Sequence, residues 1–242
     1  MASLRAYAKC IGLRGEVSVA RDFLGFARGQ LPPDPTGAVV VVSLKRQVER
    51  LKGRHFHLNV TAVGSDQFTD DDYIEIDYSV YKLRNIYDQV SLGVGRVQHW
   101  NVTTAQANGL DTPTSGDDLE QLTEDWTVPN DALDMFMPHN MSVPSNGGSV
   151  LGQSPEGGSC DKNAKGMTGS TCGLWTSEQT ARSFAHEIGH YLGLGHKNDQ
   201  PDNLMAQTSA VMAAGKSIRD SVQLTADQGG TVRGHCFVHD GC

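Results

Sequence analysis

Apolar residues recur with two different periods in the first half of the chain. Between His55 and Val63 they alternate with polar residues (HFHLNVTAV), which is the pattern of a strand with one buried face. Between Asp70 and Val90 they recur every three or four residues behind three aspartates, which predicts a long amphipathic helix. Two further segments of strand length, GRVQHWNV around Trp100 and ALDMFM from residue 132, are separated by polar, acidic loops. We therefore expect a sheet with a helix packed on it.

The second half of the chain begins with a long segment that has no clear period. Residues Pro144–Thr176 are rich in Gly and Ser, so we expect a long surface loop there. A second helix is predicted over Thr176–Leu194, with Thr176 or the following serine as N-cap and a glutamate in its first turn. After a further loop over Gly195–Val222, Thr225 stands three residues before a glutamine, which is capping-box spacing. That spacing predicts a last helix.

A proline-rich stretch, LPPDPTG, separates the start of the chain from the rest. We expect an N-terminal segment of unknown role over residues 1–36. Residues 37–242, which begin with the apolar run GAVVVV, are expected to form one compact domain. The 38% hydrophobic content of the 242 residues is sufficient for a core of this size.

Charge and hydropathy exclude several classes of protein. The formal net charge of -8 disfavours a nucleic-acid partner, because phosphate binding requires clustered Lys and Arg. No run of about 18 apolar residues is present, so no membrane-spanning helix is expected. The first residues, MASLRAYAKC, have no apolar stretch of the length found in a secretory signal, so export cannot be inferred from a leader.

The cysteines indicate disulfides. Cys160 and Cys172 bracket a loop rich in Gly and Ser, and Cys236 and Cys242 bracket the chain end. This pattern is typical of short disulfides in an extracellular protein, whereas reduced thiols in a cytosolic protein are the alternative. Four cysteines allow three pairings. Two local loops require the least rearrangement, and we expect a bridge between Cys160 and Cys172 beside the second helix. Cys10 then has no local partner.

The sequence from His186 to His196 is HEIGHYLGLGH. On a helix, residues four apart share a face, so His186 and His190 present two imidazoles to one point. Gly193 can end the helix in a left-handed conformation, and the chain can then return His196 as a third ligand. Three neutral imidazoles leave a metal its full charge and one open position, which is typical of a catalytic rather than a structural zinc site.

Glu187, next to the first of these histidines, provides the remaining chemistry. Zinc can lower the pKa of a coordinated water toward about 7, and Glu187 can accept the proton and pass it to a leaving amine. The expected reaction is the hydrolysis of a polarised carbonyl. The motif specifies five positions: the three histidines, Glu187 and Gly193. All five would match by chance in roughly one chain of this composition in several tens of thousands, whereas His-Glu-x-x-His alone would match in roughly one in a hundred.

The extended motif resembles that of the metzincin clan of zinc endopeptidases. The resemblance implies that His186, His190 and His196 bind zinc and that Glu187 is the general base. It also implies a methionine in a tight turn beneath the metal. Met205, in the segment DNLMAQTS, fits that position, and Met212 is the less favoured alternative.

The resemblance also implies a fold class. It is an α+β fold with a twisted mixed sheet and two long helices in the N-terminal part, a zinc cleft, and a small C-terminal part with the Met-turn and a final helix. In this chain the two parts correspond to about residues 37–195 and 196–242. Lys197 follows the third histidine, and Gln207 stands where astacin-like and serralysin-like members have a tyrosine that approaches zinc. The family within the clan is therefore left open.

These patterns predict a zinc-dependent endopeptidase with one catalytic zinc ion. We expect it to act as a monomer on a protein or peptide bound extended along an edge strand. A zinc-binding protein of the same fold with little turnover is one alternative, and Glu187 argues against it because a site kept only for metal needs no base. An amide hydrolase that acts on a small non-peptide substrate is another, and the motif does not exclude it.

Three weaker signals have competing interpretations. The thiolate of Cys10 could fill the open zinc position and keep the enzyme latent, but we favour a buried core residue or a disulfide with a C-terminal cysteine. The acidic stretches Asp70–Asp72 and Asp117–Glu120 lack a full loop of calcium ligands, so we expect helix capping and solvation there. Most of the other histidines are expected in strands or on the surface without a metal. They are His55, His57, His99, His139, His235 and His239.

Overall fold

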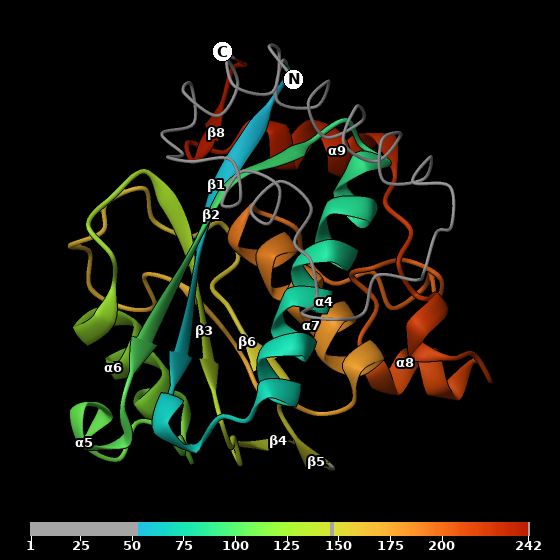
Figure 1. Cartoon of the computed structure of the whole chain (residues 1–242). Coiled ribbons are helices and arrows are strands. Elements are labelled where there is room, and N and C mark those ends of the chain that lie inside the picture. The colour runs from blue at the N-terminus through green and yellow to red at the C-terminus, as the bar shows by residue number, and fades with distance from the viewer. Residues whose placement is uncertain (1–52, 146–147, 242) are drawn as a thin grey trace, which may run out of the picture.

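The computed structural model describes residues 53–145 and 148–241, and six strands within them form one mixed sheet (Figure 1). The sheet order is β2-β1-β3-β7-β6, with β8 beside one end of β1. The first four of these strands are parallel, whereas β6 is antiparallel to β7 and β8 is antiparallel to β1. The mixed sheet agrees with the predicted α+β fold class. The bounds are β1 His55–Val63, β2 Gly93–Val102, β3 Ala132–Pro138, β6 Gly152–Gln153, β7 Ser170–Cys172 and β8 Val238–His239.

β1 lies between β2 and β3 in the sheet, and both of its faces are buried. Its apolar residues Phe56, Leu58 and Val60 pack in the main core, as the alternation predicts. The polar residues between them are predicted to face solvent, but all nine residues of β1 are buried. The reason is a polar network on the second face, where Asn59 donates a hydrogen bond to Asp134 of β3 over 2.6 Å. A strand with parallel partners on both sides is covered on both faces.

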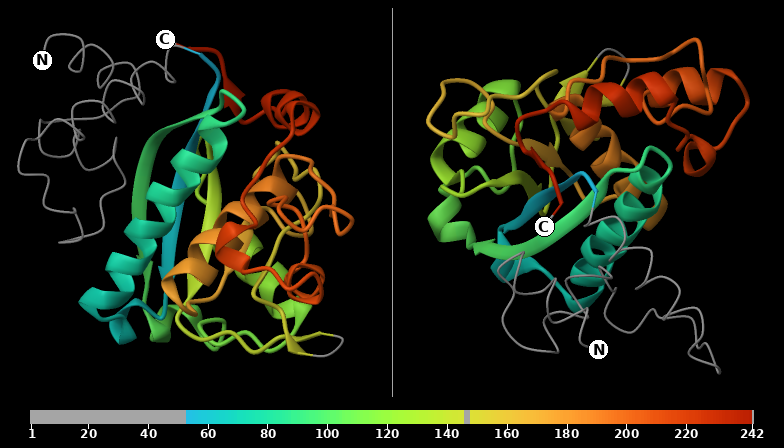
Figure 2. Two further views of the ribbon diagram at one scale, coloured as in Figure 1. Left: turned by 90° about the vertical axis from the view of Figure 1, so that its right-hand side faces the viewer. Right: turned by 90° about the horizontal axis from the view of Figure 1, so that it is seen from above.

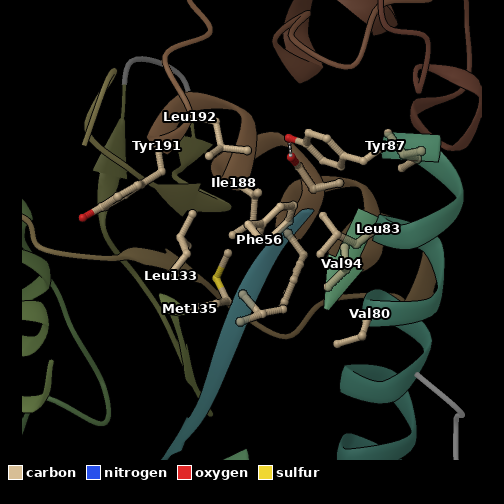
Figure 3. Close-up of a cluster of buried hydrophobic side chains, with 14 of the residues drawn as sticks. Phe56, Val80, Leu83, Tyr87, Val94, Leu133, Met135, Ile188, Tyr191 and Leu192 are labelled. Atoms are coloured by element: carbon tan, nitrogen blue, oxygen red, sulfur yellow. Dashed lines mark hydrogen bonds between the residues drawn. The ribbon is translucent and has the colours of Figure 1, made fainter. Parts of the chain in front are cut away.

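Two long helices cover one face of the sheet and pack against each other (Figure 2). α4 (Asp70–Asp88) begins with a capping box, and α7 (Ser177–Tyr191) follows β7. Figure 3 shows side chains of both helices interleaved with those of β1, β2 and β3 in one apolar cluster. The hydroxyl of Tyr87 donates a hydrogen bond to the carbonyl oxygen of Ala185, 3.0 Å away, and so joins the two helices inside the core. Among the helices of the described part, none has the length and apolar character needed to cross a membrane.

The opposite face of the sheet is covered by two helices that were not predicted. α5 (Thr104–Ala107) and α6 (Gly116–Trp126) lie where the sequence indicates polar, acidic loops. Leu122 of α6 shares a small apolar cluster with Phe136 of β3. A capping box begins α6, with Asp118 as its carboxylate, so the acidic residues of this stretch cap a helix.

Both predicted loops of the second half contain short elements. The first provides β6 and β7 and a separate two-stranded hairpin, and the second contains a helix and a 3-10 turn. These elements are too short to show a period, and β6 and β7 exist because they pair with each other and with β3. The last helix begins at the predicted capping box. The bounds are β4 Pro144–Ser145, β5 Gly148–Ser149, α8 Thr208–Ala213, η2 Ile218–Asp220 and α9 Ala226–Arg233.

The disulfide pairing differs from the prediction. Cys160 is bonded to Cys236, with 6.1 Å between their Cα atoms, so the local bridges do not form. Cys172 is a free, fully buried thiol because its strand, β7, packs on α7. Burial raises the pKa of this thiol. Cys10 and Cys242 lie outside the described residues, as does the run GAVVVV.

We expect digestion of the non-reduced protein to yield a linked pair of peptides, one with Cys160 and the other with Cys236. Cys172 is expected to react with an alkylating reagent only after denaturation. The bridged cysteines are 76 residues apart, so replacing both with serine is expected to lower the free energy of unfolding by about 2–4 kcal/mol. Mass spectrometry and denaturant unfolding measure the two results. A peptide pair that links Cys160 to Cys172 would contradict the structure.

Candidate metal centre

The side chains of His186 and His190 project from the last turns of α7 toward one place. They are four residues apart, so one face of the helix carries both. Beyond the helix, Gly193 has a left-handed φ of 98°, and the chain turns back to bring in His196. Nε2 of His190 lies 3.0 Å from Nε2 of His186 and 3.2 Å from Nε2 of His196. Three ring nitrogens therefore converge on one point.

Backbone carbonyls hold two of these histidines in a defined orientation. Nδ1 of His186 lies 2.7 Å from the carbonyl oxygen of Leu204, and Nδ1 of His190 lies 2.7 Å from that of Leu194. A carbonyl oxygen only accepts, so each Nδ1 carries the proton and each Nε2 presents a lone pair. Two lone pairs that face each other at 3.0 Å repel unless a cation lies between them. The donor set therefore fits a metal ion, and such outer hydrogen bonds are typical of histidine ligands.

Desolvation lowers the pKa of all three imidazoles, of which His186 and His190 are buried and His196 is exposed. It lowers the pKa of His186 well below its usual value, and the positive charge of Arg182 lowers it further. A neutral imidazole binds a metal without first losing a proton, so this environment suits a cation site near neutral pH.

Glu187 is buried beside the histidine cluster, where β6 passes α7. The two are so close that a Cβ added at Gly152 of β6 would lie 2.7 Å from Cγ of Glu187. Burial raises the pKa of Glu187 to about 8, and the charge of Arg182 acts in the opposite direction. A divalent cation in the cluster would also favour the ionised carboxylate. A carboxyl group in such an environment can accept and release a proton.

A buried arginine secures the segment next to the cluster. Arg182 lies one helical turn before His186 and donates hydrogen bonds to the carbonyl oxygens of Leu204, at 2.6 Å, and of Ala206. The carbonyl oxygen of Leu204 therefore accepts from both Arg182 and His186. Because one carbonyl joins the arginine and the histidine, the turn over residues 204–206 is tied to the cluster.

Met205 stands in this turn and packs directly against α7. It is fully buried, and a Cβ added at Gly189 would lie 2.6 Å from its Sδ. Its carbonyl oxygen accepts a hydrogen bond from the backbone N–H of Lys197, the residue after His196. Met212, the other candidate for the Met-turn, is 68% exposed on α8 and is unsuited to packing beneath a metal.

Two other groups of side chains in the described part lie close enough together to hold an ion. One consists of His235 and the two cysteines that form the disulfide, so its sulfur atoms are already bonded. The other consists of His57, Asp131 and His239. There, Nδ1 of His57 accepts a hydrogen bond from the backbone N–H of Arg96, and the Arg96 side chain pairs with Asp131. Competing partners therefore weaken both groups as metal sites.

Some residues close to the cluster are not indicated by the motif. Gly152 and Glu156 lie in the segment rich in Gly and Ser, where no periodicity marks them. Arg182 lies four residues before His186, so helical spacing alone could have identified it as a neighbour on the same face.

A comparison with family profiles identifies the family of this chain. A profile of reprolysin-like sequences, described as metallo-peptidase family M12, matches residues 67–231. A comparison of the sequence with curated proteins gives no match.

Among solved structures, the chain is similar to archaemetzincin from Methanopyrus kandleri, with 14% identity and a TM-score of 0.49 over 74% of this chain and 94% of that one. It is also similar to metalloproteinase-II from Bacteroides fragilis, with 12% identity and a TM-score of 0.48 over 74% of this chain. The match covers 52%, about half, of the Bacteroides chain. Since the family profile matches more than half of the sequence, the chain belongs to metallo-peptidase family M12 and is a zinc metallopeptidase of the metzincin clan.

Proposed function

We propose that this chain is a zinc-dependent endopeptidase that binds one zinc ion through His186, His190 and His196. The observation that carries the proposal is the convergence of three Nε2 atoms, with two of the rings oriented by backbone carbonyls. Membership of the M12 family supports zinc as the metal. Met205 is then the methionine of the Met-turn, because it is buried against the helix that carries two of the ligands.

Glu187 is the general base of this proposal. A zinc ion, when bound, polarises the substrate carbonyl and lowers the pKa of a water toward about 7. Glu187 accepts a proton from the attacking water and later donates it to the leaving amine. The C–N bond of the peptide breaks, the water oxygen stays on the carbonyl carbon, and the products are a carboxylic acid and an amine.

The peptide is proposed to lie extended along β6. This strand ends the sheet order and is antiparallel to β7, so an additional strand can pair with its outer edge. Gly152 has no side chain to separate this edge from Glu187. A peptide paired there would pass its scissile bond close to the base and the histidine cluster. Edge pairing leaves both ends of the peptide free, which is what cleavage at an internal bond requires.

The test is a cleavage assay with casein and with quenched peptides blocked at both termini. We expect cleavage of both, loss of cleavage after incubation with a zinc chelator, and recovery on addition of zinc. Blocked peptides identify an endopeptidase because an exopeptidase needs a free terminus. Small N-acyl amides are tested in parallel as non-peptide substrates. Cleavage of these amides alone would favour the small-substrate hydrolase, and bound zinc without turnover of any substrate would favour the binding protein.

Other predictions from the sequence stay open. Action as a monomer, an extracellular location and the division between residues 1–36 and 37–242 are still predictions. The disulfide between Cys160 and Cys236 is compatible with an extracellular location. Latency through Cys10 concerns a residue outside the described part of the chain.

A further inference from the structure

The third histidine of the cluster is held differently from the other two. Nδ1 of His186 and Nδ1 of His190 each bond to a backbone carbonyl. For His196, the hydrogen bonds within the described residues include one at Nε2 and none at Nδ1. A histidine ligand normally donates its second ring N–H to a carboxylate or carbonyl, which fixes the ring and raises its basicity. Among the described residues, His196 therefore lacks the hydrogen-bond partner at Nδ1 that the other two rings have.

A carboxylate, that of Glu156, lies beside Gly195, the residue that precedes His196. Glu156 follows β6, and the next two residues fasten its backbone to the end of α7. The N–H of Gly157 donates to the carbonyl oxygen of His190 over 2.9 Å, and that of Gly158 donates to the carbonyl oxygen of Tyr191 over 2.8 Å. Because this anchor is at the carboxyl end of the helix, the Glu156 side chain is held near the chain that leads into His196.

Gly195 shows how close the carboxylate is. A Cβ added at Gly195 would lie 3.0 Å from Oε1 and 3.2 Å from Oε2 of Glu156. Gly195 is not among the glycines with positive φ, so its backbone would accept another residue. The backbone conformation at Gly195 does not require glycine. The missing side chain instead leaves room for the Glu156 carboxylate, which occupies the place of a Cβ.

Glu156 itself is exposed, so its side chain can rotate while its backbone stays anchored.

We propose that Glu156 is the positioning residue of His196. Its carboxylate accepts a hydrogen bond from Nδ1–H of His196 when the metal is bound, and so directs the Nε2 lone pair toward the metal. The proposal rests on the proposed zinc site. Glu156 therefore affects the affinity for zinc and the orientation of the His196 ring. It does not need to contact the substrate.

The test measures the zinc affinity of the full chain by competition with a chelating indicator. Glu156→Ala is expected to weaken zinc binding by about 10- to 100-fold, the usual effect of removing such a partner. Glu156→Gln, which keeps an acceptor oxygen without the charge, is expected to lose less. Asp199→Asn is the matched control, since Asp199 is exposed three residues after His196 and its substitution also removes one negative charge. This control should keep the affinity of the unmodified protein.

A spectroscopic measurement distinguishes positioning from general stability. In zinc-loaded protein labelled with 15N-histidine, the Nδ1–H resonance of His196 is expected to be protected from exchange and to lose that protection in Glu156→Ala. The melting temperature of the metal-free protein should not change. Gly195→Ala should reproduce part of the loss of affinity, and the loss in the double variant with Glu156→Ala should be less than additive, because both changes act on one contact.

Unchanged zinc affinity in Glu156→Ala would overturn the proposal. If that variant instead raised KM only for peptides with a basic side chain, Glu156 would be a substrate-binding residue. Failure of the zinc site itself gives a different result, because the unmodified protein would then bind no stoichiometric zinc.

Discussion

Glu187→Gln is expected to keep its zinc and to lose at least about a hundredfold in peptide turnover. General-base catalysis typically contributes a factor of this size or more, and glutamine cannot accept the proton. The substitution preserves the shape of a side chain that is packed between α7 and β6, so the histidine cluster should be undisturbed. Metal binding and chemistry should therefore separate in this variant.

The measurement combines zinc analysis with initial rates on a quenched peptide. Glu178→Gln is the matched control, because Glu178 lies in the first turn of the same helix and bonds to Tyr78 and Lys82 at the surface. It should retain turnover. If Glu187→Gln cleaves peptides at a near-normal rate, Glu187 is not the base. If it loses zinc as well, the two roles are not separable by this variant and Glu187 contributes to the metal site.

His190→Ala is expected to lose the bound zinc and, with it, peptide cleavage. His190 is central to the cluster, since its Nε2 lies close to those of both other histidines. Its removal leaves two nitrogens, whereas a catalytic zinc site normally has three protein ligands. The lost bond from Nδ1 to the carbonyl oxygen of Leu194 also loosens the return of the chain toward His196.

Zinc per chain is measured after dialysis against a weak chelator, with circular dichroism as the check on folding. His139→Ala is the control: His139 is partly exposed, contacts Asp72 and Asn140, and lies outside the cluster. It should keep one zinc ion per chain. If a folded His190→Ala also keeps one tightly bound zinc, the ligand assignment is wrong.

Helices and strands could be predicted where residues close together in the sequence determine them. α4 and α9 are set by capping boxes and by spacing within a few residues, and both begin where the sequence predicts. α6 also has such a signal, Ser115 followed by Asp118, and the helix capping expected at Asp117–Glu120 is found there, but the helix itself was not predicted. β6 and β7 have no local signal, because strands of two or three residues form only where a partner strand lies beside them.

The sequence by itself determined that three imidazoles and a glutamate belong to one site, because the four-residue spacing and the glycine-terminated helix bring them together within eleven residues. Only the tertiary structure decided which groups surround that site. Cys160 reaches Cys236 rather than Cys172 because β7 takes Cys172 into the core, and Glu156 meets Gly195 because its backbone is anchored to the end of α7. Such contacts join segments that are tens of residues apart, and the packing of the whole sheet against its helices sets their distances, which no local spacing records.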